Sequence, residues 1–227
     1  MKTNLSSNET ICGWIYFTFY LFLLPSILTA VNGMLPAPLS SAELNFAYFF
    51  LNFLVILWIF HDFLGESFRQ VTRHPIMVLE AVILGGVAYF SCRWCIERII
   101  AWLAPGFTNA NDASISGLLK GNFFLMTLGT VILVPPVEEC MYRGLIFRRL
   151  YGVNKWAAYL ISATSFALLH ILGFIGVYSP LELCLAVLQY LPAGLCLAWA
   201  YVRGGSIYTP IFIHAIVNAE GIYRLGG

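Results

Sequence analysis

The chain has 227 residues, of which 60% are hydrophobic and only 10% are charged, and its mean hydropathy is +0.82. A water-soluble domain carries about 25% charged residues to solvate its surface, so this composition excludes a soluble globule and a disordered chain. The net charge of +1 leaves no basic surface for nucleic acid. The sequence therefore predicts an integral, multi-pass membrane protein whose partners are membrane lipid and not nucleic acid.

Long apolar runs predict the membrane spans. A spanning helix needs about 20 mostly apolar residues, and about seven such runs are present. We therefore expect an all-α polytopic membrane helical bundle of about seven transmembrane helices. The expected spans, in chain order, are 11–31, 44–60, 76–103, 121–149, 156–172, 181–201 and 206–223. The third run is long enough to end near Cys92 and to continue as an amphipathic interfacial piece over residues 93–103.

The positive charges in the short loops predict the orientation, because loops rich in Lys and Arg stay on the cytoplasmic side. They fall unevenly on alternate loops. One side has Lys2, Arg69, Arg73, Arg148, Arg149, Lys155 and Arg203, and the other has Lys120 and Arg224. The amino terminus is expected in the cytoplasm and the carboxyl terminus outside, unless an eighth span reverses the latter.

The six cysteines predict no disulfide framework. They lie almost wholly within apolar segments, where a free cysteine behaves as a small hydrophobic residue. Cys92 and Cys95 form a C-x-x-C pair, but no second pair is present to complete a zinc site.

Ionisable and amide side chains inside three late spans are the strongest functional signal. A charge near the bilayer centre costs about 2.5–3.5 kcal/mol and persists mainly where it is paired or used. A spacing of four puts Glu139 with Arg143 on one helix face, and Glu138 lies about 100° around the helix from Glu139. The full set is Glu138, Glu139, Arg143, His170, His214 and Asn218.

Depth supports a shared site. At 1.5 Å per residue, Glu138, Glu139, His170, His214 and Asn218 lie about 12–21 Å from the cytoplasmic ends of their spans. This range is the middle of a hydrocarbon core of about 30 Å. Each group alone could be a neutralised pair or a hydrogen bond between packed helices. Together, at one depth, they predict an intramembrane polar site.

Pro135 and Pro136 directly precede the two glutamates. Proline removes an amide donor and clashes with the preceding turn, so we expect the fourth span to break or kink here. The second half would restart as a new helix, with Glu138 and Glu139 near its free amides. Irregular backbone at this depth is tolerated beside protein or a water-filled cavity, which predicts a wet site.

Three motifs occur in order on the late spans: E-E-x-x-x-R at 138–143, F-x-x-x-H at 166–170 and H-x-x-x-N at 214–218. Together with P-I-x-x-H at 210–214, they resemble the CPBP family of intramembrane proteases, also called the Abi or type II CAAX prenyl endopeptidase family. The resemblance covers residues 119–227 and implies a catalytic transmembrane domain there, after a variable amino-terminal region of three spans at 1–118.

The resemblance implies hydrolysis of a peptide bond in a membrane-associated protein or peptide. Some family members trim prenylated CAAX proteins, and many bacterial ones are linked to bacteriocin self-immunity or peptide maturation. A bacterial cell membrane is therefore the expected location.

The residues suggest a mechanism that requires no cofactor. Amide hydrolysis needs an activated water, a donor for the oxyanion and an acid for the leaving amine. Glu138 can act as the general base with His170 sharing the proton transfer, and His214 and Asn218 can stabilise the oxyanion. Arg143 would hold Glu139.

A zinc mechanism uses the same side chains, because Glu138, His170 and His214 make a two-histidine, one-carboxylate ligand set with an open position for water. We favour the glutamate mechanism, since Asn218 is a natural oxyanion donor and a poor zinc ligand.

Two other classes of function remain open. A small transporter would also place Glu, His and Asn at the membrane midplane, but no second span has a proline pair directly before acidic residues. A non-catalytic immunity or scaffold protein would tolerate loss of the polar set, whereas all six motif positions are intact.

Overall fold

The computed structural model describes residues 5–226; Lys2, one of the charges expected in the cytoplasm, lies outside them. Within this range the chain folds into helices and forms no strand, which confirms the all-α class. The helices are α1 (Ser7–Phe22), α2 (Leu24–Gly33), α3 (Ser41–Ile59), α4 (His61–Arg73), α5 (Pro75–Leu103), α6 (Ala110–Gly121), α7 (Phe123–Leu128), η1 (Gly129–Leu133), α8 (Val134–Glu139), η2 (Cys140–Phe147), α9 (Arg148–Tyr151), α10 (Lys155–Ile171), η3 (Leu172–Phe174), α11 (Pro180–Gly204) and α12 (Tyr208–Gly226).

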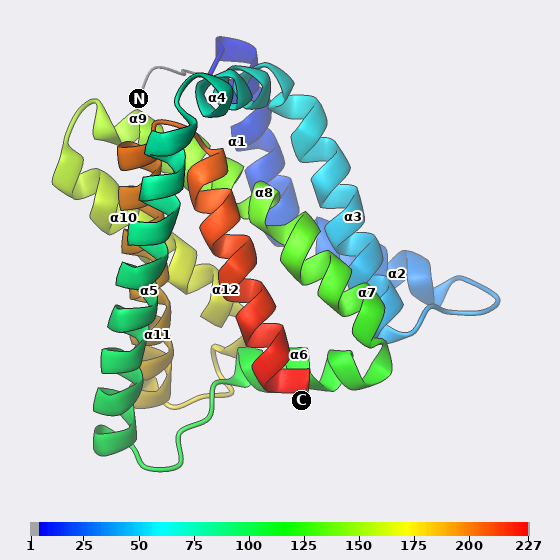
Figure 1. Ribbon diagram of the computed structural model, residues 1–227. Helices are drawn as coiled ribbons and strands as arrows, with labels where there is room; N and C mark the ends of the chain where they lie inside the picture. The colour runs from blue at the N-terminus through cyan, green and yellow to red at the C-terminus, as the bar shows by residue number, and fades with distance from the viewer. Residues whose placement is uncertain (1–4, 227) are drawn as a thin grey trace.

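The helices form a membrane bundle, as expected (Figure 1). Within residues 5–226, five helices are long and apolar enough to cross a membrane, and the pair α1 and α2, bent by 51°, can make a sixth span. The expected seventh span corresponds to α12. Its 19 residues are long enough to cross, but His214, Asn218 and Glu220 make it less apolar than the other five. The count of seven therefore stays a prediction.

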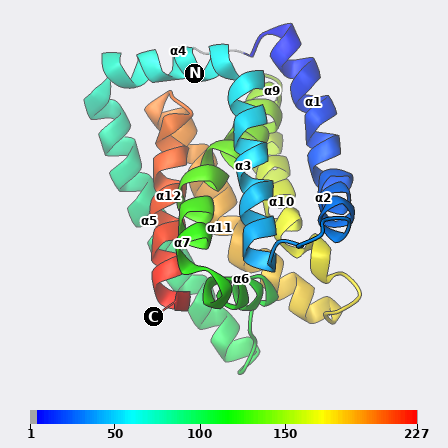
Figure 2. The same cartoon turned by 90° about the vertical axis from the view of Figure 1, so that its right-hand side faces the viewer.

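The third expected span differs from the structure. Helix α5 runs without interruption from Pro75 to Leu103, so the separate interfacial piece expected after Cys92 is wrong. Neither proline nor glycine follows Gly86 in this helix, and Arg93 pairs with Glu220 of α12 inside the bundle. The charged segment between the second and third expected spans is the amphipathic helix α4, which lies across one end of the bundle (Figure 2).

The fourth span, Phe123–Tyr151, is also continuous, so the expected restart at the prolines is wrong. Wide π-helical turns, η1 and η2, flank the short α8 that carries both prolines and both glutamates. A proline ring clashes with the carbonyl four residues earlier, and for Pro135 and Pro136 that carbonyl lies in η1. The wider turn there accommodates the rings, and the helix continues.

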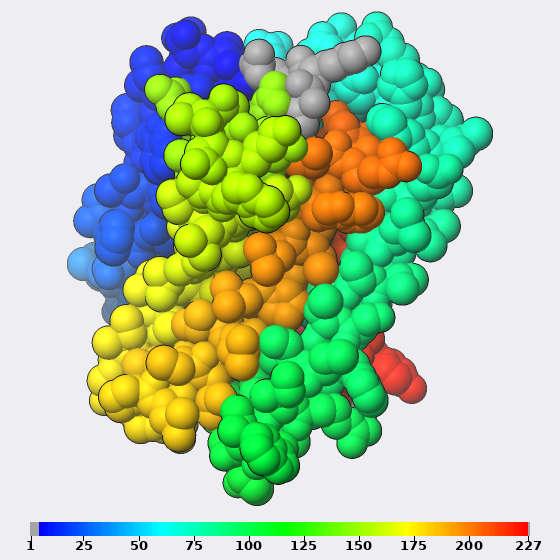
Figure 3. All heavy atoms as spheres, turned by 90° about the vertical axis from the view of Figure 1, so that its left-hand side faces the viewer, coloured from blue at the N-terminus to red at the C-terminus, as the bar shows by residue number. Residues whose placement is uncertain are grey.

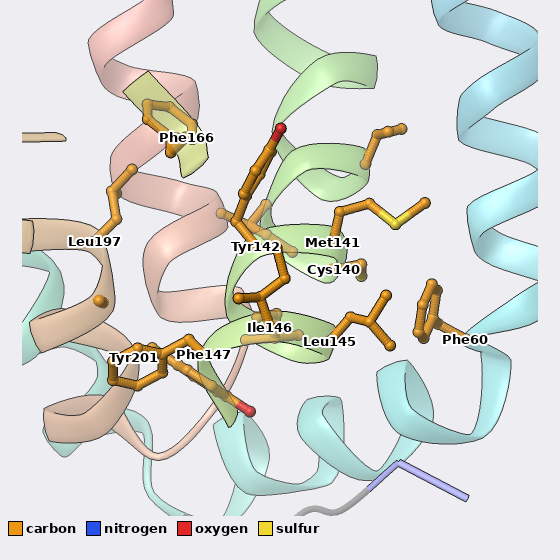
Figure 4. Packing of buried hydrophobic residues seen from close by; sticks show 14 of the residues in the cluster. Phe60, Cys140, Met141, Tyr142, Leu145, Ile146, Phe147, Phe166, Leu197 and Tyr201 are labelled. Atoms are coloured by element: carbon orange, nitrogen blue, oxygen red, sulfur yellow. The ribbon is translucent and has the colours of Figure 1, made fainter. Parts of the chain in front are cut away.

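The core surrounds η2, whose eight residues are all buried. Figure 4 shows Tyr142, Leu145 and Phe147 pointing away from η2 towards neighbouring helices. Lipid tails are as apolar as these side chains, so close packing between helices, more than escape from water, favours this core. Figure 3 shows α5, α10 and α11 side by side on one face.

The core includes residues from both halves of the chain. Tyr16, Phe60 and Tyr89 from the first half are buried in the same cluster as Tyr142 and Tyr201. The proposed division at residue 118 stays a prediction, and the two parts share this packing.

The bundle has two distinct ends: α4 and α9 lie at one, and α6 and the carboxyl end of α12 lie at the other (Figure 1). Because α5 continues to Leu103, Arg93 and Arg98 belong near the α6 end. The positive charges at the α4 end still outnumber those at the α6 end. The former are Arg69, Arg73, Arg148, Arg149, Lys155 and Arg203, and the latter are Arg93, Arg98, Lys120 and Arg224.

This charge difference predicts a cytoplasmic α4 end. In a variant without the six native cysteines, Val153→Cys tests the α9–α10 loop and Thr108→Cys tests the α5–α6 loop; both positions are exposed. A membrane-impermeant maleimide applied to intact cells should label only Thr108→Cys. Val153→Cys should react only after permeabilisation. The reverse labelling would contradict the orientation.

Candidate active site

The polar residues expected from the sequence come together between α8, α10 and α12. Glu138, His170, His214 and Asn218 line one cavity of about 470 Å³. Glu139 and Arg143 lie behind its wall, and both side chains are fully buried. The structure thus separates the set into groups that face the cavity and groups that support them.

Glu139 is the centre of the supporting group. Its Oε1 atom accepts hydrogen bonds from Arg143 Nη1 at 3.1 Å and from His214 Nδ1 at 2.8 Å. The Arg143 pair is the expected one at a spacing of four. The contact with His214, 75 residues later in the chain, joins α8 to α12.

Arg143 extends this group to two further helices. Its Nη2 atom donates to the carbonyls of Ala193 and Gly194 in α11, at 3.3 and 3.2 Å. Its guanidinium carbon lies 4.6 Å from the ring centroid of Phe166 in α10. A buried cation needs several partners, because burial removes its hydration. Here a carboxylate, two carbonyls and an aromatic face take the place of water.

His214 has its two ring nitrogens between the two glutamates. Since Glu139 accepts from Nδ1, the other nitrogen, Nε2, is directed away from Glu139 and lies 3.8 Å from Glu138 Oε2. This distance exceeds that of a hydrogen bond. The supporting carboxylate therefore fixes the orientation of the ring and places a hydrogen on Nδ1.

Glu138 is much less constrained than Glu139. It is 8% exposed, whereas Glu139 is fully buried, and its buried Oε2 atom, like that of Glu139, has no hydrogen-bond partner. The side chain lines the large cavity and also a pocket of about 30 Å³ beside Tyr20, Tyr48 and Asn52. A buried acceptor without a partner is costly in an apolar site, so Glu138 is suited to take a proton or a water hydrogen bond there.

His170 and Asn218 are both oriented by backbone carbonyls. His170 Nδ1 lies 2.8 Å from the carbonyl of Phe166, which can only accept, so Nδ1 carries the hydrogen and Nε2 is left as the second ring nitrogen. Asn218 Nδ2 donates to the carbonyl of Thr130 at 2.8 Å. An amide nitrogen has two hydrogens, so one remains for a group in the cavity.

The residues as placed do not form the zinc site of the alternative mechanism. Within residues 5–226, no three His, Cys, Asp or Glu side chains come close enough to hold a metal ion. Glu138, His170 and His214 line the same cavity, but they do not converge closely enough to share one ion. We therefore derive no step through a metal.

Residues 120–219 match the sequence model of the family described as type II CAAX prenyl endopeptidase Rce1-like. The match includes Glu138, Glu139, Arg143, His170, His214 and Asn218, and it confirms the resemblance seen in the motifs. No curated protein and no solved structure matches the chain significantly. The segment that is similar to this family thus includes every cavity-facing and supporting residue expected from the sequence.

The mouth of the cavity contains ion pairs that the sequence analysis missed. Arg93 makes two hydrogen bonds to Glu220, at 2.7 and 2.8 Å, and Arg224 contacts Glu97 at 3.3 Å. Burial raises the pKa of the Asp112 carboxyl nearby. Arg93 and Glu220 are 127 residues apart, so spacing gives no signal for the pair. The presence of Glu220 in an apolar run was the available clue.

The supporting group makes a testable contribution to stability. We expect Arg143→Ala to reduce the free energy of unfolding by about 3–5 kcal/mol, because Glu139 would remain as a buried carboxylate without its cation. Unfolding in mixed micelles by titration with a denaturing detergent measures this loss.

Arg203→Ala is the matched control for this measurement. Arg203 pairs with Glu80 at 3.5 Å, with both side chains about half exposed, so its loss should cost less than about 1 kcal/mol. Equal losses of unfolding free energy in the two variants would show that the Arg143 pair contributes no more to stability than a surface pair.

Proposed function

We propose that this chain is an intramembrane endopeptidase that hydrolyses a peptide bond of a membrane-associated protein or peptide with a water activated by Glu138 and His170. The observation that carries the proposal is that the two adjacent glutamates have different environments. Glu139 is bonded through Oε1 to Arg143 and His214 and lies outside the cavity lining, whereas Glu138 lines the cavity.

Glu138 is the general base in this proposal. A water in the cavity loses a proton to Glu138 as its oxygen attacks the peptide carbonyl carbon. When the tetrahedral intermediate collapses, the carbon–nitrogen bond breaks and the same proton passes to the leaving amine. His170 shares in this transfer through Nε2, because its Nδ1 is held by the carbonyl of Phe166.

His214 and Asn218 stabilise the oxyanion. The protonated His214 ring donates through Nε2 while Nδ1 donates to Glu139, and Asn218 donates its second amide hydrogen. Both donors are held in place before substrate binds. Preorganised donors stabilise a developing charge without a reorganisation cost during the reaction.

The substrate class is proposed from the family that the segment matches. A farnesylated peptide with a CAAX carboxyl terminus represents prenylated proteins, and an apolar peptide of similar length represents bacteriocin-type or other membrane peptides. Incubation of each with the purified chain in lipid vesicles, followed by mass spectrometry, identifies the cleaved bond. An unprenylated copy of the CAAX peptide reveals whether the lipid group is needed.

We expect Glu138→Gln to lower turnover of a cleaved peptide by about 100- to 10,000-fold, because it removes the general base while keeping the shape of the side chain. Glu80→Gln is the matched control. Glu80 is exposed, lies outside the cavity and should leave turnover unchanged. Near-normal turnover of Glu138→Gln would contradict the assignment of the base.

Metal dependence separates the glutamate mechanism from a zinc mechanism. We expect activity to persist after treatment with a strong chelator, and elemental analysis of active protein to find no stoichiometric zinc. One zinc per active chain, lost in His214→Ala, would contradict the glutamate mechanism and leave the protease assignment intact.

A further inference from the structure

The ring of His170 contacts two aromatic side chains. Tyr190 of α11 stacks on it, with ring centroids 4.2 Å apart and an angle of 24° between the planes. Phe166, one turn earlier in α10, contacts it with centroids 4.7 Å apart. The hydrogen bond from Nδ1 to the Phe166 carbonyl fixes one atom of the ring, and the stacking with Tyr190 fixes its plane.

Tyr190 is itself held at its hydroxyl. Asn109 Nδ2 and Asn111 Nδ2 donate to this oxygen at 3.2 and 3.1 Å, and Asn109 also donates to Gln189 at 2.6 Å. Asn109 and Asn111 lie at the start of α6, before the segment that matches the Rce1-like family. Through these bonds, two asparagines of the amino-terminal part of the chain contact the tyrosine that stacks on His170.

We propose that Tyr190 is a positioning residue for His170, and that Asn109 and Asn111 hold Tyr190 in place. The catalytic consequence rests on the proposed function, because it requires His170 to transfer protons. Proton transfer needs the donor and acceptor within hydrogen-bond reach, and a displacement of about 1 Å can cost on the order of 100-fold in rate. A histidine held only at Nδ1 could rotate its plane, whereas the stacked ring cannot.

The first test measures the stacking without any substrate. A stacked aromatic ring shifts the proton resonances of its neighbour, so the His170 ring protons should be displaced upfield in protein carrying isotope-labelled histidine. His170→Ala assigns the signals among the four histidines of the chain.

Tyr190→Leu should remove the displacement, and Tyr190→Phe should retain most of it. The His214 signals should not change in Tyr190→Phe, which serves as the internal control. Identical His170 signals in Tyr190→Leu and the unmodified protein would overturn the proposal, whatever the protein cleaves.

The second test measures the effect on catalysis with a cleaved peptide. We expect Tyr190→Leu to lower kcat about 10- to 100-fold with little change in KM. The kcat of Tyr190→Phe should lie between those of Tyr190→Leu and the unmodified protein, because this variant keeps the stacking and loses the hydrogen bonds from the asparagines. Tyr223→Leu, an exposed position outside the cavity, is the control and should have no effect.

A double variant separates positioning from an independent role. In a His170→Ala background, Tyr190→Leu should cause no further loss of kcat, since no ring remains to be positioned. An equal loss in both backgrounds would overturn the proposal, and so would a Tyr190→Phe variant as slow as Tyr190→Leu.

Discussion

A fully buried carboxylate, Glu139, determines how the polar residues of this bundle are arranged. It accepts hydrogen bonds from Arg143 and His214 at one oxygen, and Arg143 continues to two carbonyls of α11 and the ring of Phe166. Five helical segments, α8, η2, α10, α11 and α12, thus meet at one ion pair. Since an unpaired charge is so costly at this depth, the bundle can pack closely only when these partners are in register.

The same constraint gives adjacent glutamates different roles. One residue along a helix is about 100° around its axis, so Glu138 and Glu139 cannot both face Arg143. Glu139 takes the buried side and Glu138 the cavity side, where its unpartnered oxygen lies beside His214. The π-helical turns on either side allow the helix to continue through two prolines and still present these faces. The position of Glu138, our proposed general base, therefore depends on Glu139, which takes no part in the proposed proton transfer.

Local patterns in the sequence predicted much of this structure. The sequence did not predict the contacts between helices. The apolar runs predicted the membrane bundle, and the spacing of four predicted the Glu139–Arg143 pair. The restart at Pro135 was wrong because the wider turns of η1 relieve the proline clash, which no residue pattern reveals. The contact of His214 with Glu139 joins residues 75 apart, and that of Tyr190 with His170 joins the successive spans α10 and α11. Neither contact has a sequence spacing that predicts it, so both needed the fold.

The protonation of His214 tests the role of Glu139 most directly. Nitrogen-15 spectra of histidine-labelled protein report which ring nitrogen carries a hydrogen, and His214→Ala assigns the signal. We predict a hydrogen on Nδ1 that is hydrogen-bonded in the unmodified protein, and an altered Nδ1 signal in Glu139→Gln. A His214 ring with its only hydrogen on Nε2, unchanged by Glu139→Gln, would contradict the account that Glu139 orients this ring.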